Sequence, residues 1–582
     1  MRRIITALGP LVVLTYTSLC LGGEPPATSA AGAGDVGYEK VASELLADLY
    51  QRNPTYATDL GLHQFDAKLE DYSRAAVQDE LAAVARFKQA LETIDPKSLS
   101  LNHRLDREML LHSLESRRID AEEVRAWARN PDNYSSGLTN SAYSLIKRNY
   151  APAAERLKSL IAREKAMPEV LAEARRNLQN PPRIYTEIAI EQLDGNQQFF
   201  RSAVVEAFAG VNDPALQAEF RKTNDAVIAG LGEYKTWLQK DLLPRSNGNF
   251  AYGADLYRRK LSADEMIDTP LVDLLRAAEA NLRQNQAAFA QAARRIDPTK
   301  PPLEVLESLQ RDHPAPDKLL ATTQAELDAL GGFMTEHHIV TIPKDAVPAQ
   351  VQETPPFMRA TTSASMDTPG PFEKGPLRGF YSMTLPDPSW DAAQTEDFMR
   401  QWFYPLITNV SVHEVWPGHY LQFLYAKDYP SEARKVLGAN SNSEGWAHYC
   451  EQMVIDEGFH ADDPRYRLAQ LQDALLRNAR FIVGIRMHTQ GMTIAQAEEF
   501  FQKEGYQPRA LAVSETKRGT SDATYGYYTM GKLAILKLRE DYRRKMGAAY
   551  SLQDFHDRFI ALGPLPLPLV REALLGERGQ LF

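Results

Sequence analysis

Two histidines and a glutamate in the stretch "SVHEVWPGHYLQ" are of the types that bind a metal ion and act on water beside it: His413, Glu414 and His419. In zinc protease helices the two histidines stand four residues apart on one face, and the glutamate after the first is the general base. Here they stand six residues apart, a rotation of about 240° on a regular helix. Pro417 breaks helical regularity and Gly418 frees the backbone. We therefore expect a two-residue bulge that returns both histidines to one face; the alternative is a kinked helix with two unrelated histidines.

A second stretch, "SNSEGWAHYCEQM", offers the third protein ligand that a catalytic zinc site requires. The polar residues Ser441–Ser443 are typical N-cap residues and predict a helix start. Glu444, His448 and Glu451 then recur at intervals of four and three, which places them on one helix face. We expect Glu444 to be the third ligand and Glu451 to be an outer carboxylate that orients a ligand histidine. His448 is the alternative third ligand.

The segment "SETKRGTSDATYGYYTMGKLAILKLRE" brings polar groups to a glycine-containing approach to a helix: Arg518, Tyr525, Tyr527 and Tyr528. A tyrosine hydroxyl or the arginine would stabilise an oxyanion there, and Arg518 would also hold a substrate carboxylate. For any one of the tyrosines, packing on the helix start is the alternative. His488 in "GIRMHTQGMT" is predicted to be a core or capping histidine.

The elements that must position these residues are mostly helices. Apolar residues recur every three or four positions in Tyr38–Arg52 and in most later segments, and proline-containing breaks at 180–183 and 297–302 separate them. Only the region 338–390 differs, because "HIVTIP" and "RGFYSMTLPDP" predict short strands on either side of a long polar loop. The sequence therefore predicts a mainly α fold, a large multi-helix body with a small β element just before the metal-binding helix.

Composition and the N-terminus narrow the class of protein. The 582 residues are 44% hydrophobic with a net charge of −10, which allows a large core and argues against nucleic acid as a partner. Arg2 and Arg3 precede an apolar run followed by small residues, the pattern of an export signal; an uncleaved membrane anchor is the alternative. Cys20 ends that run, where a lipoprotein carries its lipid, although Leu19 before it is larger than usual. If cleavage removes Cys20, Cys450 is left alone and no intrachain disulfide forms.

The chain is expected to form one large domain behind an export region. The predicted parts are, in order, a signal peptide over 1–25, a linker over 26–36 and a helical metallopeptidase-like domain over 37–582, divided into a scaffold lobe (37–337), strands with a long loop (338–390) and zinc-site helices (391–582). The protein would be periplasmic or a cell-envelope lipoprotein, and would touch the membrane only through a lipid on Cys20.

The stretches "HEVWPGHYLQ" and "NSEGWAHYCE" and the C-terminal tyrosine-glycine segment resemble the bacterial domain-of-unknown-function family 885, a group of zinc peptidase-like proteins. The resemblance spans nearly the whole chain after the export region. The family in turn resembles helical gluzincins such as the thermostable-type carboxypeptidases and dipeptidyl peptidase III. This resemblance implies a helical body with a deep cleft, zinc on His413, His419 and Glu444, a base at Glu414, and a motif tyrosine at Tyr528.

An exported zinc-dependent metallopeptidase, hydrolysing short peptides near a terminus as a carboxypeptidase or dipeptidase, is the function that these motifs favour. Zn²⁺ as the cofactor follows from the His/His/Glu ligand set. One departure concerns specificity: this chain has "DATY" at 522–525, where the family has Pro-Gly-Gln-Ala. The alternatives are a zinc hydrolase of non-peptide amides or esters, and an inactive cell-envelope binding protein with a vestigial metal site.

Overall fold

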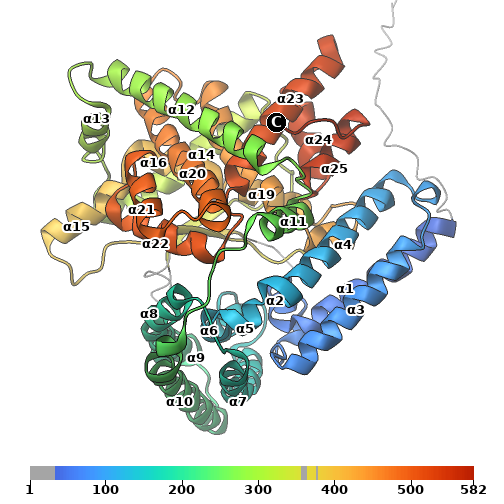
Figure 1. Cartoon of the computed structure of the whole chain (residues 1–582). Coiled ribbons are helices and arrows are strands. Elements are labelled where there is room, and N and C mark those ends of the chain that lie inside the picture. Colours follow the sequence, from blue (N-terminus) through green and yellow to red (C-terminus); the bar gives the residue numbers. More distant parts are fainter. Residues whose placement is uncertain (1–32, 355–362, 375–377) are drawn as a thin grey trace, which may run out of the picture.

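The computed structural model describes residues 33–354, 363–374 and 378–582 (Figure 1). The predicted signal peptide with Cys20, and most of the predicted linker, lie outside these residues. The last four residues of that linker are helical instead, because α1 (Ala33–Arg52) begins before the predicted domain boundary. Asp35 anchors this start of α1. Its carboxylate accepts hydrogen bonds from the Ser100 backbone at 2.9 Å and from the His103 ring at 2.8 Å.

The described chain is mainly α, as predicted. The N-terminal helices, blue in Figure 1, are α1 with α2 (Pro54–Asp59), α3 (Arg74–Glu92) and α4 (Leu101–Ile119). The next group, at the bottom of Figure 1, comprises α5 (Ala126–Arg129), α6 (Asp132–Ile146), α7 (Ala153–Asn177), α8 (Arg183–Arg201), α9 (Ala203–Phe208) and α10 (Pro214–Trp237). The predicted break at 180–183 falls between α7 and α8.

The remaining helices form the larger body of the molecule. They are α11 (Ala254–Glu265), α12 (Leu271–Ile296), α13 (Pro302–Leu309), α14 (Leu319–Glu336), α15 (Ala392–Met399), α16 (Tyr404–Glu414), α17 (His419–Ala426), α18 (Glu432–Val436), α19 (Asn440–Asp456), α20 (Pro464–Thr489), α21 (Ile494–Lys503), α22 (Arg509–Ser521), α23 (Tyr527–Met546), α24 (Leu552–Ala561) and α25 (Leu567–Leu575). Among the described residues, no helix is both long and apolar enough to cross a membrane.

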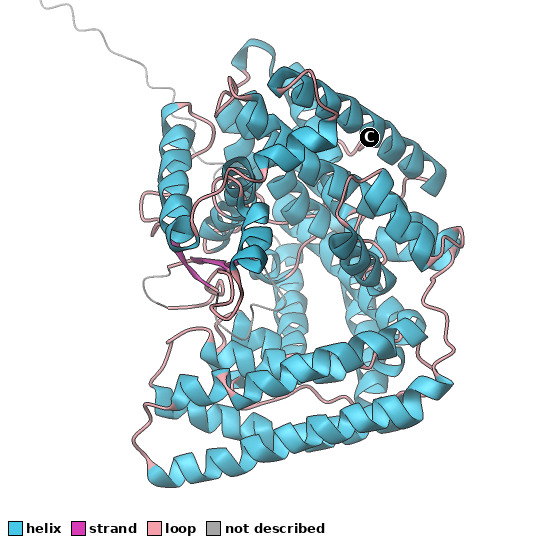
Figure 2. Ribbon diagram, turned by 90° about the vertical axis from the view of Figure 1, so that its left-hand side faces the viewer, coloured by secondary structure: helices cyan, strands magenta, loops and turns pink. Residues whose placement is uncertain are grey.

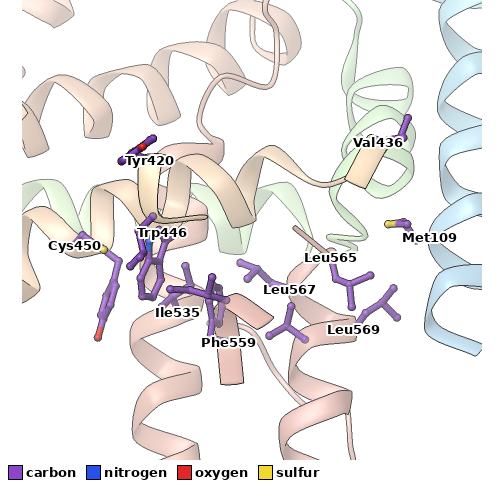
Figure 3. Packing of buried hydrophobic residues seen from close by; sticks show 14 of the residues in the cluster. Met109, Tyr420, Val436, Trp446, Cys450, Ile535, Phe559, Leu565, Leu567 and Leu569 are labelled. Atoms are coloured by element: carbon purple, nitrogen blue, oxygen red, sulfur yellow. The ribbon is translucent and has the colours of Figure 1, made fainter. Parts of the chain in front are cut away.

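Three clusters of buried hydrophobic side chains hold these helices together. The first joins α1–α4 to α14, α16–α19 and α23–α25, and Figure 3 shows part of it around Trp446 and Phe559. The second joins α11–α13 to α20–α22 and the first turn of α23, and the third lies within α6–α10. The segment 37–337 contributes to all three clusters. Because α23 supplies Tyr528 to the second cluster and Ile535 to the first, this helix links the two.

A small sheet, magenta in Figure 2, precedes the helices that carry the histidines. Its strands are β1 (Gln350–Glu353), β2 (Ala364–Asp367) and β3 (Phe380–Met383), in the order β1-β3-β2. β1 runs parallel to β3, and β2 runs antiparallel to it. The prediction of a strand in "RGFYSMTLPDP" is confirmed by β3.

The other predicted strand, "HIVTIP", is wrong. The chain there leaves α14 in a left-handed turn, with φ of 51° at His338 and a hydrogen bond of 3.0 Å from the Ile339 N–H to the Met334 carbonyl. Ile339 and Val340 fill the first cluster without strand partners. β1 and β2 come instead from the segment predicted to be a loop. A strand requires a partner, and β3 lies about 30 residues away from β1 in sequence.

Candidate metal centre

His413 and His419 belong to two separate helices that meet at a tight turn; the predicted bulge within one helix is wrong. α16 ends one residue after His413, the Trp416–Pro417 peptide bond is cis, and α17 begins at His419. Proline cannot continue the helix, because its ring clashes with the preceding turn. Gly418 packs so closely on α16 that a Cβ would lie 1.8 Å from the His413 carbonyl oxygen. The turn brings the two imidazole centroids to 4.9 Å, with the rings at 89°.

The helix α19, which carries the predicted third ligand, is fixed against this turn. It begins one residue before Ser441–Ser443, so these residues lie in its first turn and are not the predicted N-cap. The buried carboxylate of Glu265 satisfies this end instead, accepting a hydrogen bond from the Ser441 N–H at 2.8 Å. Further along α19, the indole N–H of Trp446 donates to the Pro417 carbonyl at 2.7 Å. These bonds set the position of Glu444 relative to both histidines.

The side chains of His413, His419 and Glu444 converge, each offering an atom within 4.8 Å of the others. Oε2 of Glu444 lies 3.4 Å from Nε2 of His413 and 3.3 Å from Nε2 of His419. This oxygen is buried and makes no hydrogen bond of good geometry. Ligand atoms held 2.0–2.1 Å from one tetrahedral zinc ion lie about 3.3 Å apart. The spacing and the unpaired oxygen therefore fit a metal ion held by these three side chains.

The converging group is partly open to solvent. The side chains of His419 and Glu444 are 25% and 24% exposed, whereas His413 is buried. Glu414, the predicted base, is the last residue of α16, and no other described residue forms a hydrogen bond or ion pair with its carboxylate. Burial raises the pKa of the Tyr381 hydroxyl on β3, and the nearby Glu414 carboxylate raises it further. The deep cleft expected around this group stays a prediction.

Glu451 holds His413 from the side away from the converging atoms. Its Oε1 accepts a hydrogen bond from Nδ1 of His413 at 2.7 Å, which leaves Nε2 free for a metal ion. Its Oε2 accepts from Nδ1 of His448 at 3.0 Å. Arg477 of α20 lies 3.0 Å from Oε1. His448 is therefore behind Glu451 and is not a member of the converging group that contains Glu444.

Charges in this group are strongly coupled. Burial alone would lower the pKa of His413, but the nearby carboxylates of Glu444 and Glu451 outweigh burial and raise that pKa to about 9. Burial opposes ionisation of both carboxylates, yet His419 and His413 hold the pKa of Glu444 well below its usual range. Arg477 does the same for Glu451. A metal ion must therefore displace a proton from His413 when it binds.

Tyr528, at the start of α23, lies beside the converging histidines. Its ring centroid is 6.4 Å from that of His413. Its hydroxyl oxygen accepts a hydrogen bond from Nη2 of Arg518 at 3.4 Å, and no described residue accepts its hydrogen. The neighbouring Tyr527 hydroxyl instead donates to Asp522 at 3.2 Å. Of the candidate tyrosines, Tyr528 therefore has a hydrogen available for a substrate oxygen.

Two glycines set the position of Tyr528 relative to the ligands. α19 and α23 cross at Gly445 and Gly531, where a Cβ on Gly531 would lie 1.9 Å from the Ser441 carbonyl oxygen and 2.7 Å from the Gly445 Cα. Gly445 directly follows Glu444, and Gly531 lies about one turn after Tyr528. The close crossing therefore brings Glu444, a candidate ligand, and Tyr528 together from different helices.

Sequence reasoning missed the arginines of α20. Arg477 and Arg480 are buried, with guanidinium carbons 5.7 and 4.9 Å from the ring centroid of Tyr528. Arg480 donates to both carboxylate oxygens of Glu515, at 2.6 and 2.7 Å. The sequence does indicate a charged helix face here, because Asp473, Arg477 and Arg480 recur at intervals of four and three in a largely apolar helix.

Two further candidates belong to the core. His488 is buried; its Nε2 lies 2.8 Å from the Gly519 carbonyl oxygen, and Tyr252 packs edge-on against its ring at 4.9 Å. Burial lowers the pKa of His488 to about 4. Tyr525 is fully buried in the second cluster. Both therefore serve packing, as the sequence allowed.

Comparisons with known proteins agree on the fold and leave the activity open. A structure from Shewanella oneidensis, described as "a putative lipoprotein of unknown function", is 27% identical, with a TM-score of 0.78 over 92% of this chain and 99% of that chain. A crystal structure of "the putative lipoprotein from Colwellia psychrerythraea" is 17% identical, with a TM-score of 0.80 over 94% and 99% of the two chains. The comparison with curated proteins gives no match. A family model described as "Bacterial protein of unknown function (DUF885)" matches residues 54–574, and the chain therefore belongs to this family.

Proposed function

We propose that the protein is a zinc-dependent metallopeptidase that cleaves short peptides near a terminus, of the carboxypeptidase or dipeptidase type. The observation that carries the proposal is the convergence of His413, His419 and Glu444, whose buried Oε2 lies near both imidazoles without a hydrogen bond of good geometry. Three protein ligands with one side open are the arrangement of catalytic zinc sites, whereas structural sites are closed by four. The unpaired carboxylate of Glu414 next to His413 supports catalysis in particular.

The roles of the side chains follow from their positions. A zinc ion at the three ligands would supply Lewis acidity, polarising the substrate carbonyl and making water more acidic. Glu414 would take a proton from the attacking water and pass it to the leaving amine nitrogen. The Tyr528 hydroxyl, whose hydrogen has no acceptor among the described residues, would donate to the carbonyl oxygen as negative charge develops. Glu451 would keep the ring of His413 oriented.

An exported or cell-envelope location goes with this function. The descriptions of the Shewanella and Colwellia structures as lipoproteins support it, together with the predicted signal and Cys20, which lie outside the described residues. A periplasmic site of action with a lipid on Cys20 is the more specific form of this proposal.

A zinc hydrolase of non-peptide amides or esters is the second candidate, because the same side chains act on any carbonyl that fits. The third, a binding protein with a vestigial metal site, is less favoured, since such a protein has no use for the unpaired carboxylate of Glu414 beside the metal ligands.

The test combines metal content with activity. Purified protein should hold about one zinc per chain, and Glu444→Ala should lose it, while Gln452→Ala on the same helix should keep it. Glu414→Gln should keep zinc and lower kcat by about 10²- to 10⁴-fold. Activity is measured on a mixed short-peptide library and on amide and ester substrates. If the wild type holds zinc but cleaves only esters or non-peptide amides, the second candidate function is favoured. If Glu444→Ala holds zinc at the wild-type level, the ligand assignment is wrong.

A further inference from the structure

Three arginines surround the ring of Tyr528 next to the metal ligands. The guanidinium carbons of Arg477, Arg480 and Arg518 lie 5.7, 4.9 and 5.7 Å from the ring centroid. Positive charge gathered in a partly buried place requires either paired carboxylates or an anionic ligand. The three arginines differ in how far their charge is already paired.

Arg477 and Arg480 are buried, and their charges are paired within the protein. Arg477 lies 3.0 Å from Glu451, and Arg480 donates to both oxygens of Glu515 at 2.6 and 2.7 Å. Both arginine side chains are only 10% exposed. They hold the ligand shell and the tyrosine in place, and neither is available to a substrate.

Arg518 differs, because part of its guanidinium is exposed and has N–H donors without a partner among the described residues. Its side chain is 36% exposed, and its Nε and Nη2 both donate to the same oxygen of Asp522, at 3.2 and 3.1 Å. That oxygen also accepts a hydrogen bond from Tyr527. Nη2 also contacts the hydroxyls of Tyr527 and Tyr528, whereas Nη1 forms no hydrogen bond with any described residue. The guanidinium is thus held in place beside Tyr528 with the donors of Nη1 left for an anion.

We propose that Arg518 binds the free α-carboxylate of the substrate, so that the enzyme is a carboxypeptidase that releases the C-terminal residue; this rests on the metallopeptidase function proposed above. In a peptide, the last peptide carbonyl carbon and the terminal carboxylate carbon are one residue apart, roughly 3.3–3.6 Å at full extension. Nη2 of Arg518 lies 3.4 Å from the Tyr528 hydroxyl, and the free Nη1 belongs to the same guanidinium. The pair therefore presents a donor for the carbonyl oxygen and a donor for the carboxylate on neighbouring side chains.

The hydrolysis balances without any co-reactant besides water. A C–O bond forms at the last peptide carbonyl, the C–N bond breaks, and Glu414 transfers the proton of the water to the leaving nitrogen. An enzyme specific for the amino terminus would need an unpaired carboxylate for the ammonium group. Glu414 already has the role of base, and the carboxylates around Tyr528, those of Glu451, Glu515 and Asp522, each pair with an arginine.

The experiment compares one short peptide in four forms: free at both ends, amidated at the C-terminus, acetylated at the N-terminus, and blocked at both. With the zinc-loaded protein, kcat/KM for the free acid should exceed that of the amide by about 10- to 100-fold, the effect of a charge-assisted hydrogen-bonded pair. Acetylation should change kcat/KM little. Cleavage that survives amidation but is lost on acetylation would overturn the proposal.

Variants at neighbouring positions show whether Arg518 is responsible. Arg518→Gln should bring the acid-to-amide ratio close to one while amide cleavage remains, and Arg518→Lys should restore part of the preference as a point charge. Lys517→Gln is the matched control, because Lys517 is adjacent on α22, is similarly exposed and pairs with Glu191 on α8. An unchanged ratio in Arg518→Gln would contradict the proposal.

Equilibrium binding separates this proposal from the metallopeptidase function. The zinc-loaded Glu414→Gln variant should bind the free-acid peptide more tightly than the amide by a similar factor, measured by calorimetry. If wild type cleaves no peptide but this binding preference holds and disappears on adding Arg518→Gln, the peptidase function fails and the carboxylate site stands. If the free acid and the amide bind equally while wild type still cleaves peptides, the carboxylate site is contradicted and the peptidase function stands.

Discussion

Tyr527 and Tyr528 are adjacent, and both hydroxyl oxygens accept from Nη2 of Arg518, yet their own hydrogens differ. Tyr527 donates its hydrogen to Asp522, whereas no described residue accepts the hydrogen of Tyr528. We expect Tyr528→Phe to lower kcat by about 10²- to 10³-fold, the cost of one oxyanion donor, with zinc content unchanged. Tyr527→Phe should have a much smaller effect. Steady-state kinetics of the two variants on one peptide make the comparison, and equal losses would rule out the oxyanion role of Tyr528.

Also at the residue scale, Glu451 would act on a bound metal ion through His413. Glu451→Gln replaces the acceptor of the Nδ1 hydrogen and leaves Arg477 without its buried partner. We expect zinc affinity to fall by about 10- to 100-fold, measured by competition with a chromogenic chelator. Asp456→Asn on the exposed end of α19 is the control for charge removal. Unchanged affinity in Glu451→Gln would show that His413 is oriented by other contacts.

At the scale of elements, the site depends on helices that approach unusually closely. Gly531→Ala would place a Cβ 1.9 Å from the Ser441 carbonyl oxygen and push α23 away from α19. We expect a loss of about 1–3 kcal/mol in the free energy of unfolding and a fall in kcat as Tyr528 moves. Urea unfolding and peptide kinetics measure the two effects.

Gly332→Ala in α14 is the matched control, because its Cβ would meet nothing within 4 Å. Alanine is the better helix former, so this variant should be more stable than wild type by about 0.5–1 kcal/mol. If both glycine variants behave alike, the close helix crossing is not what positions Tyr528.

Element prediction from the sequence succeeded where the pattern is local. The breaks at 180–183 and 297–302 separate real helices, and the spacing of Glu444, His448 and Glu451 gives one face of α19. Prediction failed where a partner far away in the sequence determines whether a segment forms a strand. "HIVTIP" is apolar and β-branched but pairs with no strand, while the polar segment β1 pairs with β3. The start of α19 was misplaced for the same reason, since Glu265 from another helix satisfies its backbone.

At the scale of the whole molecule, partly buried polar contacts tie the N-terminal helices to the rest. His63, after α2, lies 3.2 Å from both Asp66 and Glu373, and its ring stacks on Tyr150 at 3.6 Å between centroids. Burial alone would lower the pKa of His63, but the hydrogen bonds to both carboxylates raise it to about 9 from 6.5. Protonated His63 therefore joins three separate parts of the chain.

The sign of the pH dependence follows from that raised pKa. The stability that His63 contributes is fully present below pH 6.5 and is lost as the pH rises through about 9. We expect wild type to be more stable than His63→Gln at pH 6, with the difference shrinking as the pH approaches 9.5. Urea unfolding of both proteins at each pH gives this difference, and a difference independent of pH would contradict the assignment of the raised pKa to His63.

The sequence by itself determined the mainly α class and the candidate ligand residues, because helical periodicity and residue chemistry are local properties. Only the tertiary structure decided that His413 and His419 meet across a helix break, that Arg477 supports Glu451, and that Tyr528 has a free hydrogen. These facts depend on contacts between helices far apart in sequence. A close glycine crossing or a buried ion pair is set by which elements pack together, and no spacing within one helix encodes that partner.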